Sequence, residues 1–235
     1  MNALVQTESG LLGSEEAVRN LSLSEKSRLL VVSDTHGHYE VFEAIMKEWG
    51  SQCDALIFSG DGMWDIVQYL EKAQAKTVLM KTLPPVIAFV AGNGDGDKYL
   101  INFSASSANS FYLENSESFI VVPRRQILHA SGHSILIVHG HRHSVDVGRE
   151  ILIASARDIH CNIAIFGHTH VSLAEQTSNV LALNPGSPTR PRGSSVPSFA
   201  ILKLDSATSI PVTEFYKVSK RIRGNFYFEK LKELT

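Results

Sequence analysis

This chain of 235 residues has few cysteines and a small net charge. The two cysteines, Cys53 and Cys161, each stand just before an apolar run. Two thiols are too few for the disulfide framework of a small secreted domain, so we interpret both as free. The 22 basic and 24 acidic side chains nearly cancel, which leaves a formal net charge of -2. That balance gives no electrostatic reason for non-specific nucleic-acid binding, and we do not expect nucleic acid as a partner.

Long hydrophobic runs are lacking as well. No stretch approaches the roughly 20 apolar residues of a membrane span, and the N-terminus shows no basic region leading into an apolar one. We therefore expect no membrane partner and a cytoplasmic location. The hydrophobic content of 43% is enough for one large core. We expect a loosely packed or partner-bound N-terminal arm over residues 1–27 and a single domain over residues 28–235.

The chain is rich in short apolar runs that end in glycine and a metal-capable side chain. Residues 29–32 read as a buried strand, and Asp34, His36 and Gly37 follow directly. The design recurs four more times, with Asp61 after residues 55–58, Asn93 and Asp95 after residues 86–90, His139 and His141 after residues 135–138, and His168 and His170 after residues 163–166.

Strand ends of this kind predict one shared site. Ligands bind at the carboxyl ends of parallel strands, and glycine lets the backbone turn tightly there. A mixture of carboxylate and imidazole suits a divalent transition metal better than magnesium or calcium. We therefore expect seven side chains at one edge of one sheet: Asp34, His36, Asp61, Asn93, His139, His168 and His170.

The wider pattern predicts an α/β fold. Helical spacing favours helices over residues 15–23, 38–49, 64–75 and 147–158. The alternation of strands and helices over the first 90 residues predicts a largely parallel sheet. Residues 98–118 are rich in Ser and Asn and read as an irregular loop or broken helix, and the strands at 119–122, 126–129 and 134–138 read as antiparallel. We expect a second sheet from residues 171–175, 180–183, 199–204 and 212–218. The result is a four-layer α/β/β/α sandwich of two mixed sheets flanked by helices.

The motif set resembles a known family. Asp-x-His, Gly-Asp, Gly-Asn, His-Gly-His and Gly-His-x-His, in this order, are similar to the calcineurin-like metallophosphoesterases, and most similar to their small bacterial phosphodiesterase branch. The stretches 184–187 (Asn-Pro-Gly-Ser) and 197–202 strengthen the narrower match. The resemblance covers roughly residues 28–217. Each motif is weak alone, but the combination is specific.

The resemblance implies two divalent metal ions. It assigns Asp34, His36, Asp61 and His170 to one ion, and Asp61, Asn93, His139 and His168 to the other, so that Asp61 bridges them. A shared carboxylate offsets the repulsion between two close cations, and a water molecule bridging them would lose its proton and become the nucleophile. Four imidazoles favour manganese and leave nickel, iron, cobalt and zinc open. Each residue also has a simpler interpretation: Asp34 could cap the next helix, and Asn93 could form only a turn.

Two neighbours are additional catalytic candidates beside Asp61 and Asn93. His141 contacts the substrate, supports a ligand or is purely structural, and the sequence does not decide between these roles. Asp95 could supply a proton, because Gly94 stands where many relatives in the wider superfamily carry the histidine thought to protonate the leaving group. Arg142, Arg190 and Arg192 could meet a phosphate.

We therefore expect a dinuclear-metal phosphodiesterase acting on a small phosphate ester. The alternatives are a phosphomonoesterase acting on nucleotides or phosphoproteins, and a non-catalytic scaffold such as the retromer subunit of eukaryotes that shares this fold but has lost part of the ligand set. All seven ligand positions are filled here, which argues against the scaffold. The sequence leaves a homo-oligomer open and does not reveal the natural substrate.

Overall fold

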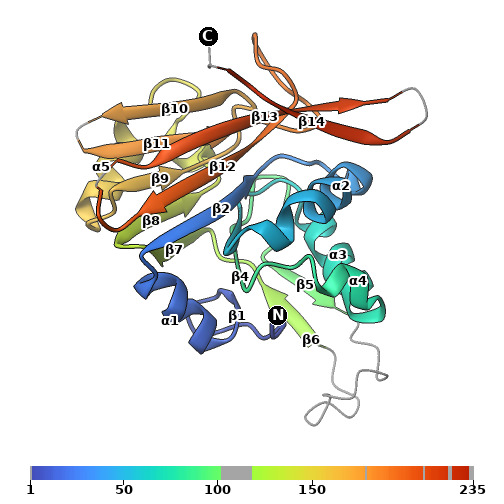
Figure 1. The fold of residues 1–235 in the computed structure, drawn as a ribbon. Coiled ribbons are helices and arrows are strands. Elements are labelled where there is room, and N and C mark those ends of the chain that lie inside the picture. Colours follow the sequence, from blue (N-terminus) through green and yellow to red (C-terminus); the bar gives the residue numbers. More distant parts are fainter. Residues whose placement is uncertain (1, 102–117, 178, 209, 222–223, 233–235) are drawn as a thin grey trace.

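Two stacked sheets with helices outside form the body of the protein. The computed structural model describes residues 2–101, 118–177, 179–208, 210–221 and 224–232. Figure 1 shows α5 beside the yellow and orange second sheet, and α2, α3 and α4 on the other side, beside the first sheet. The four-layer arrangement predicted from the sequence is confirmed.

The first sheet has seven strands in the order β1-β4-β3-β2-β12-β13-β14. The central strands β2, β3 and β4 are parallel, and the remaining pairs are antiparallel. In spatial order the strands are β1 (Leu12–Gly13), β4 (Val86–Phe89), β3 (Ala55–Phe58), β2 (Lys26–Val32), β12 (Ser198–Asp205), β13 (Val212–Lys220) and β14 (Phe226–Lys230).

The second sheet has five strands in the order β10-β11-β9-β8-β7. Here β8, β9 and β11 are parallel, and both edge strands are antiparallel. The strands are β10 (Ser172–Thr177), β11 (Val180–Pro185), β9 (Ile163–Ile165), β8 (His133–Val138) and β7 (Arg125–Ala130).

Helices cover the outer faces and follow the strands they pack on. The long ones, α2 (Tyr39–Trp49) and α3 (Met63–Ala75), confirm the predicted helices at 38–49 and 64–75, and α5 (Glu150–Asp158) lies within the predicted 147–158. The other described helices are α1 (Glu15–Leu23), α4 (Thr77–Met80) and the 3-10 turns η1 (Gly50–Gln52) and η2 (His141–His143). No helix among the described residues is long and apolar enough to cross a membrane.

Alternation along β2 explains why its apolar run is continuous. Leu30 and Val32 belong to the core beneath α2 and α3, whereas Leu29 and Val31 belong to the core between the two sheets. A strand covered on both faces needs apolar side chains at every position. Because β2, β3 and β4 are parallel, the residues that directly follow each of them lie at the same edge of the sheet.

The prediction for the C-terminal strands is wrong in one respect. Residues 199–204 and 212–218 were expected in the second sheet, but β12 and β13 join the first, where β12 pairs antiparallel with β2. Burial on both faces makes β12 apolar throughout, and such a run does not identify which sheet it enters. The strand is therefore visible in the sequence, but its partner is not.

The segment after Asp95 also differs from the prediction. Instead of a loop or broken helix starting at residue 98, β5 (Lys98–Ile101) pairs antiparallel with β6 (Ser118–Val121) in a small separate sheet. The rest of the predicted loop, residues 102–117, lies outside the described residues. Period-2 alternation is present, since Tyr99 and Ile101 are buried and Lys98 and Leu100 are exposed, but four residues are too short to be decisive.

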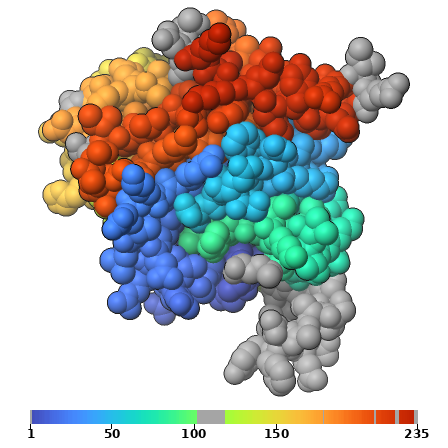
Figure 2. Space-filling view, in the orientation of Figure 1, coloured from blue at the N-terminus to red at the C-terminus, as the bar shows by residue number. Residues whose placement is uncertain are grey.

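The N-terminal residues are not a loosely packed arm. The predicted helix at 15–23 is present as α1, and β1 extends the first sheet by pairing with β4. Leu11, Leu12 and Leu21 are buried, and the blue segment lies directly against the rest of the molecule (Figure 2). The expected division after residue 27 falls inside β2.

The buried side chain of Asn2 fastens this segment. Its amide nitrogen donates to the carbonyl oxygens of Leu12, Pro84 and Pro85 at 3.2, 2.9 and 3.1 Å. We expect Asn2→Ala to lower the free energy of unfolding by about 1–3 kcal/mol, because buried carbonyl groups lose their donor. Urea unfolding measures this, with Val5→Ala at an exposed position as the control. Equal midpoints for both variants would contradict an integral N-terminal segment.

Candidate metal centre

The predicted ligands follow the strands as the sequence indicates. Asp34 and His36 follow β2, Asp61 follows β3, Asn93 lies beyond β4, His139 follows β8, and His168 and His170 lie beyond β9. The prediction that all seven ligands lie at one edge of one sheet is wrong, because β2, β3 and β4 belong to the first sheet and β8 and β9 to the second. The ends of strands from both sheets contribute to one site.

Asp34, His36 and His170 form one compact group, whose ligand atoms all lie within 4.8 Å of one another. The Nε2 atoms of His36 and His170 are 3.0 Å apart. Asp34 Oδ1 is 3.2 Å from Nε2 of His170 and 3.9 Å from Nε2 of His36. All three residues carry atoms that can bind a metal.

A second compact group contains Asp34, Asp61 and His139. His139 Nε2 lies 3.5 Å from Asp61 Oδ2 and 4.0 Å from Asp34 Oδ1. Asn93 joins this side, with its Oδ1 at 3.2 Å from the same Nε2. The two groups share Asp34, whereas the family resemblance gives Asp61 the shared position.

The donor set fits divalent transition metals. Asp34 is fully buried, and its Oδ1 has no hydrogen-bond partner among the described residues. A buried carboxylate oxygen without a partner is costly, and imidazole nitrogens facing it leave a position that a cation satisfies. Oxygen and imidazole together suit manganese, iron, cobalt, nickel or zinc.

Two of the histidines are oriented by backbone carbonyl groups. Nδ1 of His139 lies 2.7 Å from the carbonyl oxygen of Ser59, and Nδ1 of His170 lies 2.6 Å from that of Arg190. Each ring therefore donates its Nδ1–H and presents the lone pair of Nε2 to the site. A hydrogen bond of this kind fixes the tautomer of a metal-binding histidine.

His168 and His141 lie beside the groups and belong to neither of them. Nε2 of His168 is 2.9 Å from Oδ2 of Asp146, a residue that the sequence gave no reason to select. The rings of His141 and His168 are centred 5.4 and 5.2 Å from the ring of His139. Nδ1 of His141 is buried without a hydrogen-bond partner. Both imidazoles are therefore next to the site and are not bound to Asp34 or Asp61.

The backbone is strained where the ligands stand. Of the ten described non-glycine residues with positive φ, five are predicted ligands: Asp34, His36, Asp61, His168 and His170. Left-handed conformations cost non-glycine residues about 1–2 kcal/mol each, and such strain concentrates at functional sites. Side-chain function, rather than backbone preference, accounts for the absence of glycine at these positions.

Glycines at two turns permit a close approach. A Cβ on Gly92 would collide with the Asp61 carboxylate, and one on Gly167 would collide with Ser33 and the Asp34 carboxylate. Any other residue at either position would push a ligand carboxylate aside. Packing against the ligand carboxylates thus explains the glycines at positions 92 and 167.

Asp95 holds the Asp61 turn in place. Its carboxylate accepts four backbone N–H groups: Asp61 at 2.7 Å, Gly92 at 2.9 Å, Met63 at 3.0 Å and Gly62 at 3.1 Å. All four donors point at carboxylate oxygens, so Asp95 is placed to position Asp61. The sequence suggested that Asp95 could donate a proton. It could not show that the Asp95 carboxylate accepts hydrogen bonds from the backbone of residues 61–63.

Further polar side chains fasten the other turns. Buried Asp65 accepts from Thr35 Oγ1 at 2.5 Å and from the Gly37 N–H at 3.1 Å. Asn184 Nδ2 donates to the Gly167 carbonyl at 2.7 Å, and Ser187 Oγ donates to the Asp34 carbonyl at 2.7 Å. The Asn-Pro-Gly-Ser stretch therefore connects the turns that carry Asp34 and His168.

The protonation states of Asp61 and His139 affect cation binding at the site. Burial raises the pKa of the Asp61 carboxyl, but the hydrogen bond and charge of His139 and the Gly94 N–H outweigh it and lower the pKa to about 2. Burial lowers the pKa of His139, whereas Asp61 and Asp34 raise it above its ordinary value. Protonation of His139 at Nε2 would compete with a cation for that atom, so metal affinity is expected to rise with pH.

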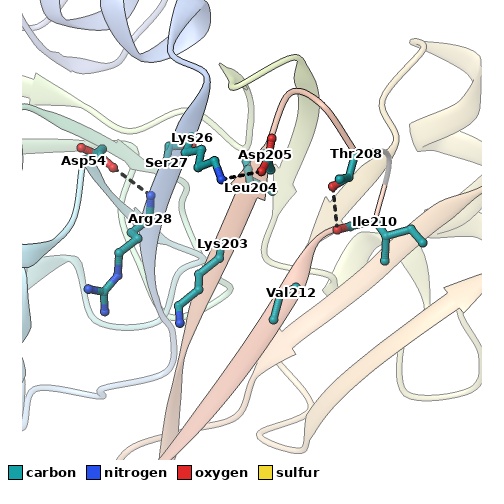
Figure 3. Close-up of a pocket in the computed structure, with 10 residues that line it drawn as sticks. All are labelled: Lys26, Ser27, Arg28, Asp54, Lys203, Leu204, Asp205, Thr208, Ile210 and Val212. Carbon is teal, nitrogen blue, oxygen red and sulfur yellow. Dashed lines mark hydrogen bonds and ion pairs between the residues drawn. The ribbon is translucent and has the colours of Figure 1, made fainter.

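A cavity of about 630 Å³ lies at the opposite end of the first sheet (Figure 3). It is lined by Lys26, at the start of β2, and by Lys203 and Asp205 of β12. Lys26 pairs with Asp205 at 3.0 Å and Lys203 pairs with Glu214 at 2.7 Å. The cavity is separate from the metal centre, which lies beyond the other end of β2.

The role of Asp95 can be tested without metal. We expect Asp95→Asn to lower the free energy of unfolding of the chelator-treated protein by about 2–4 kcal/mol, because the amide group turns an NH₂ toward backbone N–H donors. Asp97→Asn, at an exposed position, makes the same change of charge and serves as the control. If urea midpoints of the two variants agreed, Asp95 would not be what holds the Asp61 turn.

Over most of its length this chain is similar to known phosphoesterases. The model of the calcineurin-like phosphoesterase superfamily domain matches residues 28–207. The chain is 25% identical over 181 residues to the probable metallophosphoesterase YsnB of Bacillus subtilis, covering 76% of this chain and 85% of that protein. It is 26% identical over 195 residues to the phosphodiesterase YfcE of Escherichia coli K12, covering 80% and 93%.

Solved structures agree on the fold. A predicted phosphoesterase from Streptococcus pneumoniae superposes with a TM-score of 0.54 at 22% identity, covering 88% of this chain and 98% of that one. Vacuolar protein sorting 29 from Cryptosporidium parvum gives 0.59 at 17% identity, covering 89% and 100%. Since the superfamily model spans most of the chain, this protein belongs to the calcineurin-like phosphoesterase superfamily.

Proposed function

We propose that this protein is a phosphodiesterase that hydrolyses small phosphate esters with two divalent transition-metal ions. The observation that carries the proposal is the pair of compact Asp/His groups meeting at the unpartnered Oδ1 of Asp34. When bound, the two cations would neutralise the phosphoryl oxygens and acidify a water molecule. The similarity to YfcE, which is named a phosphodiesterase, supports the diester over the monoester.

The proposed ligand sets follow the family resemblance. Asp34, His36, Asp61 and His170 would hold one ion, and Asp61, Asn93, His139 and His168 would hold the other. His168 must then leave Asp146, whose side chain is 56% exposed. An ion pair with so exposed a partner contributes little, so a cation competes with it readily. Four imidazoles favour manganese over magnesium.

A scaffold role is the second candidate, because vacuolar protein sorting 29 has this fold. Three features support an enzyme instead: every ligand position is filled, the histidine tautomers present Nε2 to the site, and strain falls on the ligands. A pure scaffold has no need of left-handed histidines. Hydrolysis separates the two candidates directly.

The proposed activity is tested with bis(4-nitrophenyl) phosphate and 4-nitrophenyl phosphate. We expect chelator-treated protein to be inactive, manganese to restore diester hydrolysis well above magnesium, and diester turnover to exceed monoester turnover. Full activity in magnesium alone would contradict the assignment of four histidines as ligands. Absence of hydrolysis with every transition metal would favour the scaffold.

Metal content identifies the bridging carboxylate. We expect Asp61→Asn to abolish turnover and to lose both ions, since one substitution removes a charge from each ligand set, whereas His36→Ala should lose one ion. Elemental analysis after dialysis measures the stoichiometry. If Asp34→Asn lost both ions while Asp61→Asn kept one, the bridge would be Asp34, the residue that the two compact groups share.

The proposed reaction lacks an evident general acid to protonate the leaving group. Gly94 has no side chain, and the Asp95 carboxylate already accepts four N–H groups. We propose His141 as the remaining candidate, because its ring lies beside that of His139 and its Nδ1 has no partner. General acid catalysis contributes roughly 10²–10⁴-fold, and a poorly placed donor forfeits much of it.

We therefore expect a steep dependence of turnover on leaving-group pKa. Aryl phosphodiesters of graded leaving-group pKa measure it. Gly94→His should flatten the slope, since a Cβ at Gly94 would lie 3.3 Å from Asp61 Oδ1, a contact that a small adjustment relieves. A flat series in the unmodified protein would mean that a proton donor is already in place, and a slope that steepened in His141→Ala would identify it.

A further inference from the structure

An exposed tryptophan stands beside the metal centre. Trp64 is the second residue of α3, three residues after Asp61, and it is 65% exposed. It is the largest of the exposed apolar side chains in the described part of the chain. The indole lies in the first turn of α3, and a ligand that covers it would remove its large apolar surface from water.

Tyr99 holds the indole in position. The two rings are centred 5.0 Å apart at 85°, an edge-to-face contact. Tyr99 is itself 5% exposed, and its hydroxyl oxygen accepts the Gly96 N–H at 2.8 Å. The indole is therefore supported by a buried neighbour and keeps most of its surface free. A surface fixed before binding loses little conformational entropy when a ligand arrives.

The Trp64–Tyr99 pair lies within reach of the centre. Burial raises the pKa of Tyr99, and the Asp95 and Asp61 carboxylates raise it further. Asp95 also binds the N–H of Met63, the residue before Trp64. Three residues span at most about 11 Å, so the backbone of Trp64 lies within about that distance of the backbone of Asp61.

We propose that Trp64 is a specificity-determining residue, on which an aromatic ring of the substrate stacks while its phosphate lies at the metal centre. The proposal rests on the proposed function and names its substrate class: phosphate esters bearing an aryl group or a nucleobase. Stacking suits either ring, because every such ring has a π-face. An ester without a ring leaves the indole uncovered.

Binding measurements test the proposal without turnover. Manganese-loaded protein is titrated with adenosine 5′-monophosphate, phenyl phosphate and ribose 5-phosphate, and tryptophan fluorescence and calorimetry report binding. The second tryptophan, Trp49, packs against Tyr216 and Phe199 in the core and provides a constant reference emission. Trp64→Ala removes the stacking surface, and Trp64→Phe keeps an aromatic ring. Neither change at an exposed position threatens folding.

We expect the ligands with rings to bind about tenfold more tightly than ribose 5-phosphate, the preference to vanish in Trp64→Ala, and most of it to remain in Trp64→Phe. A preference for adenosine 5′-monophosphate alone identifies a nucleobase, and one for phenyl phosphate alone identifies a simple aryl group. Equal affinity for all three ligands, or a preference unchanged in Trp64→Ala, overturns the proposal.

The same titration separates failure of this proposal from failure of the proposed function. If diesters are hydrolysed but no ring preference exists, the phosphodiesterase stands and Trp64 has no role in specificity. If no ester is hydrolysed but ring-bearing phosphates still bind through Trp64, the site binds such phosphates without cleaving them. In that second case the stacking role survives and the proposed reaction does not.

Discussion

The structure depends on a carboxylate that the protein buries without completing its hydrogen bonds. Asp34 is sealed from solvent, one of its oxygens has no donor, and imidazoles from both sheets face it. Such an arrangement is costly for the protein alone. A cation held by Asp34 and these imidazoles would satisfy the unpartnered oxygen, and its binding would then stabilise the folded protein. The stacking of the two sheets brings His139 and His170 to the end of β2, where both face Oδ1 of Asp34.

Precision at the site comes from a second layer of polar groups. Asp65 fastens the turn that carries His36, Asp95 fastens the turn that carries Asp61, and the Asn184 amide fastens the turn at Gly167. Each of these three contacts uses backbone N–H or C=O groups of the ligand turns and none of the ligand side chains. The left-handed conformations of the ligands are tolerated because these bonds determine the backbone around them. The rigidity of the centre is thus a property of the turns.

Sequence reasoning succeeded where local pattern is enough. An apolar run, a glycine and a metal-capable side chain together predict a strand and the residue that follows it, and Asp34, Asp61 and His139 do stand directly after strands. It failed where the outcome depends on distant partners. The sequence of β12 does not reveal that this strand pairs with β2. The sequence around Asp95 does not reveal that its carboxylate accepts backbone N–H groups. Nothing in residues 139–150 indicates that Asp146 lies beside His168. The sequence identified Trp64 only as a helix residue. Its contact with Tyr99 of β5 depends on tertiary packing that the sequence does not show.

The place of β12 between β2 and β13 has a consequence for how the protein is made. β2 is complete by residue 32, but its antiparallel neighbour begins at Ser198. During synthesis, one edge of β2 therefore stays unpaired until more than 160 further residues have been added. Pairings over such sequence separations form slowly, and an open strand edge invites association with other chains. The first sheet of this protein can therefore be completed only after the chain has been made through β12, by which point every candidate ligand has also been added.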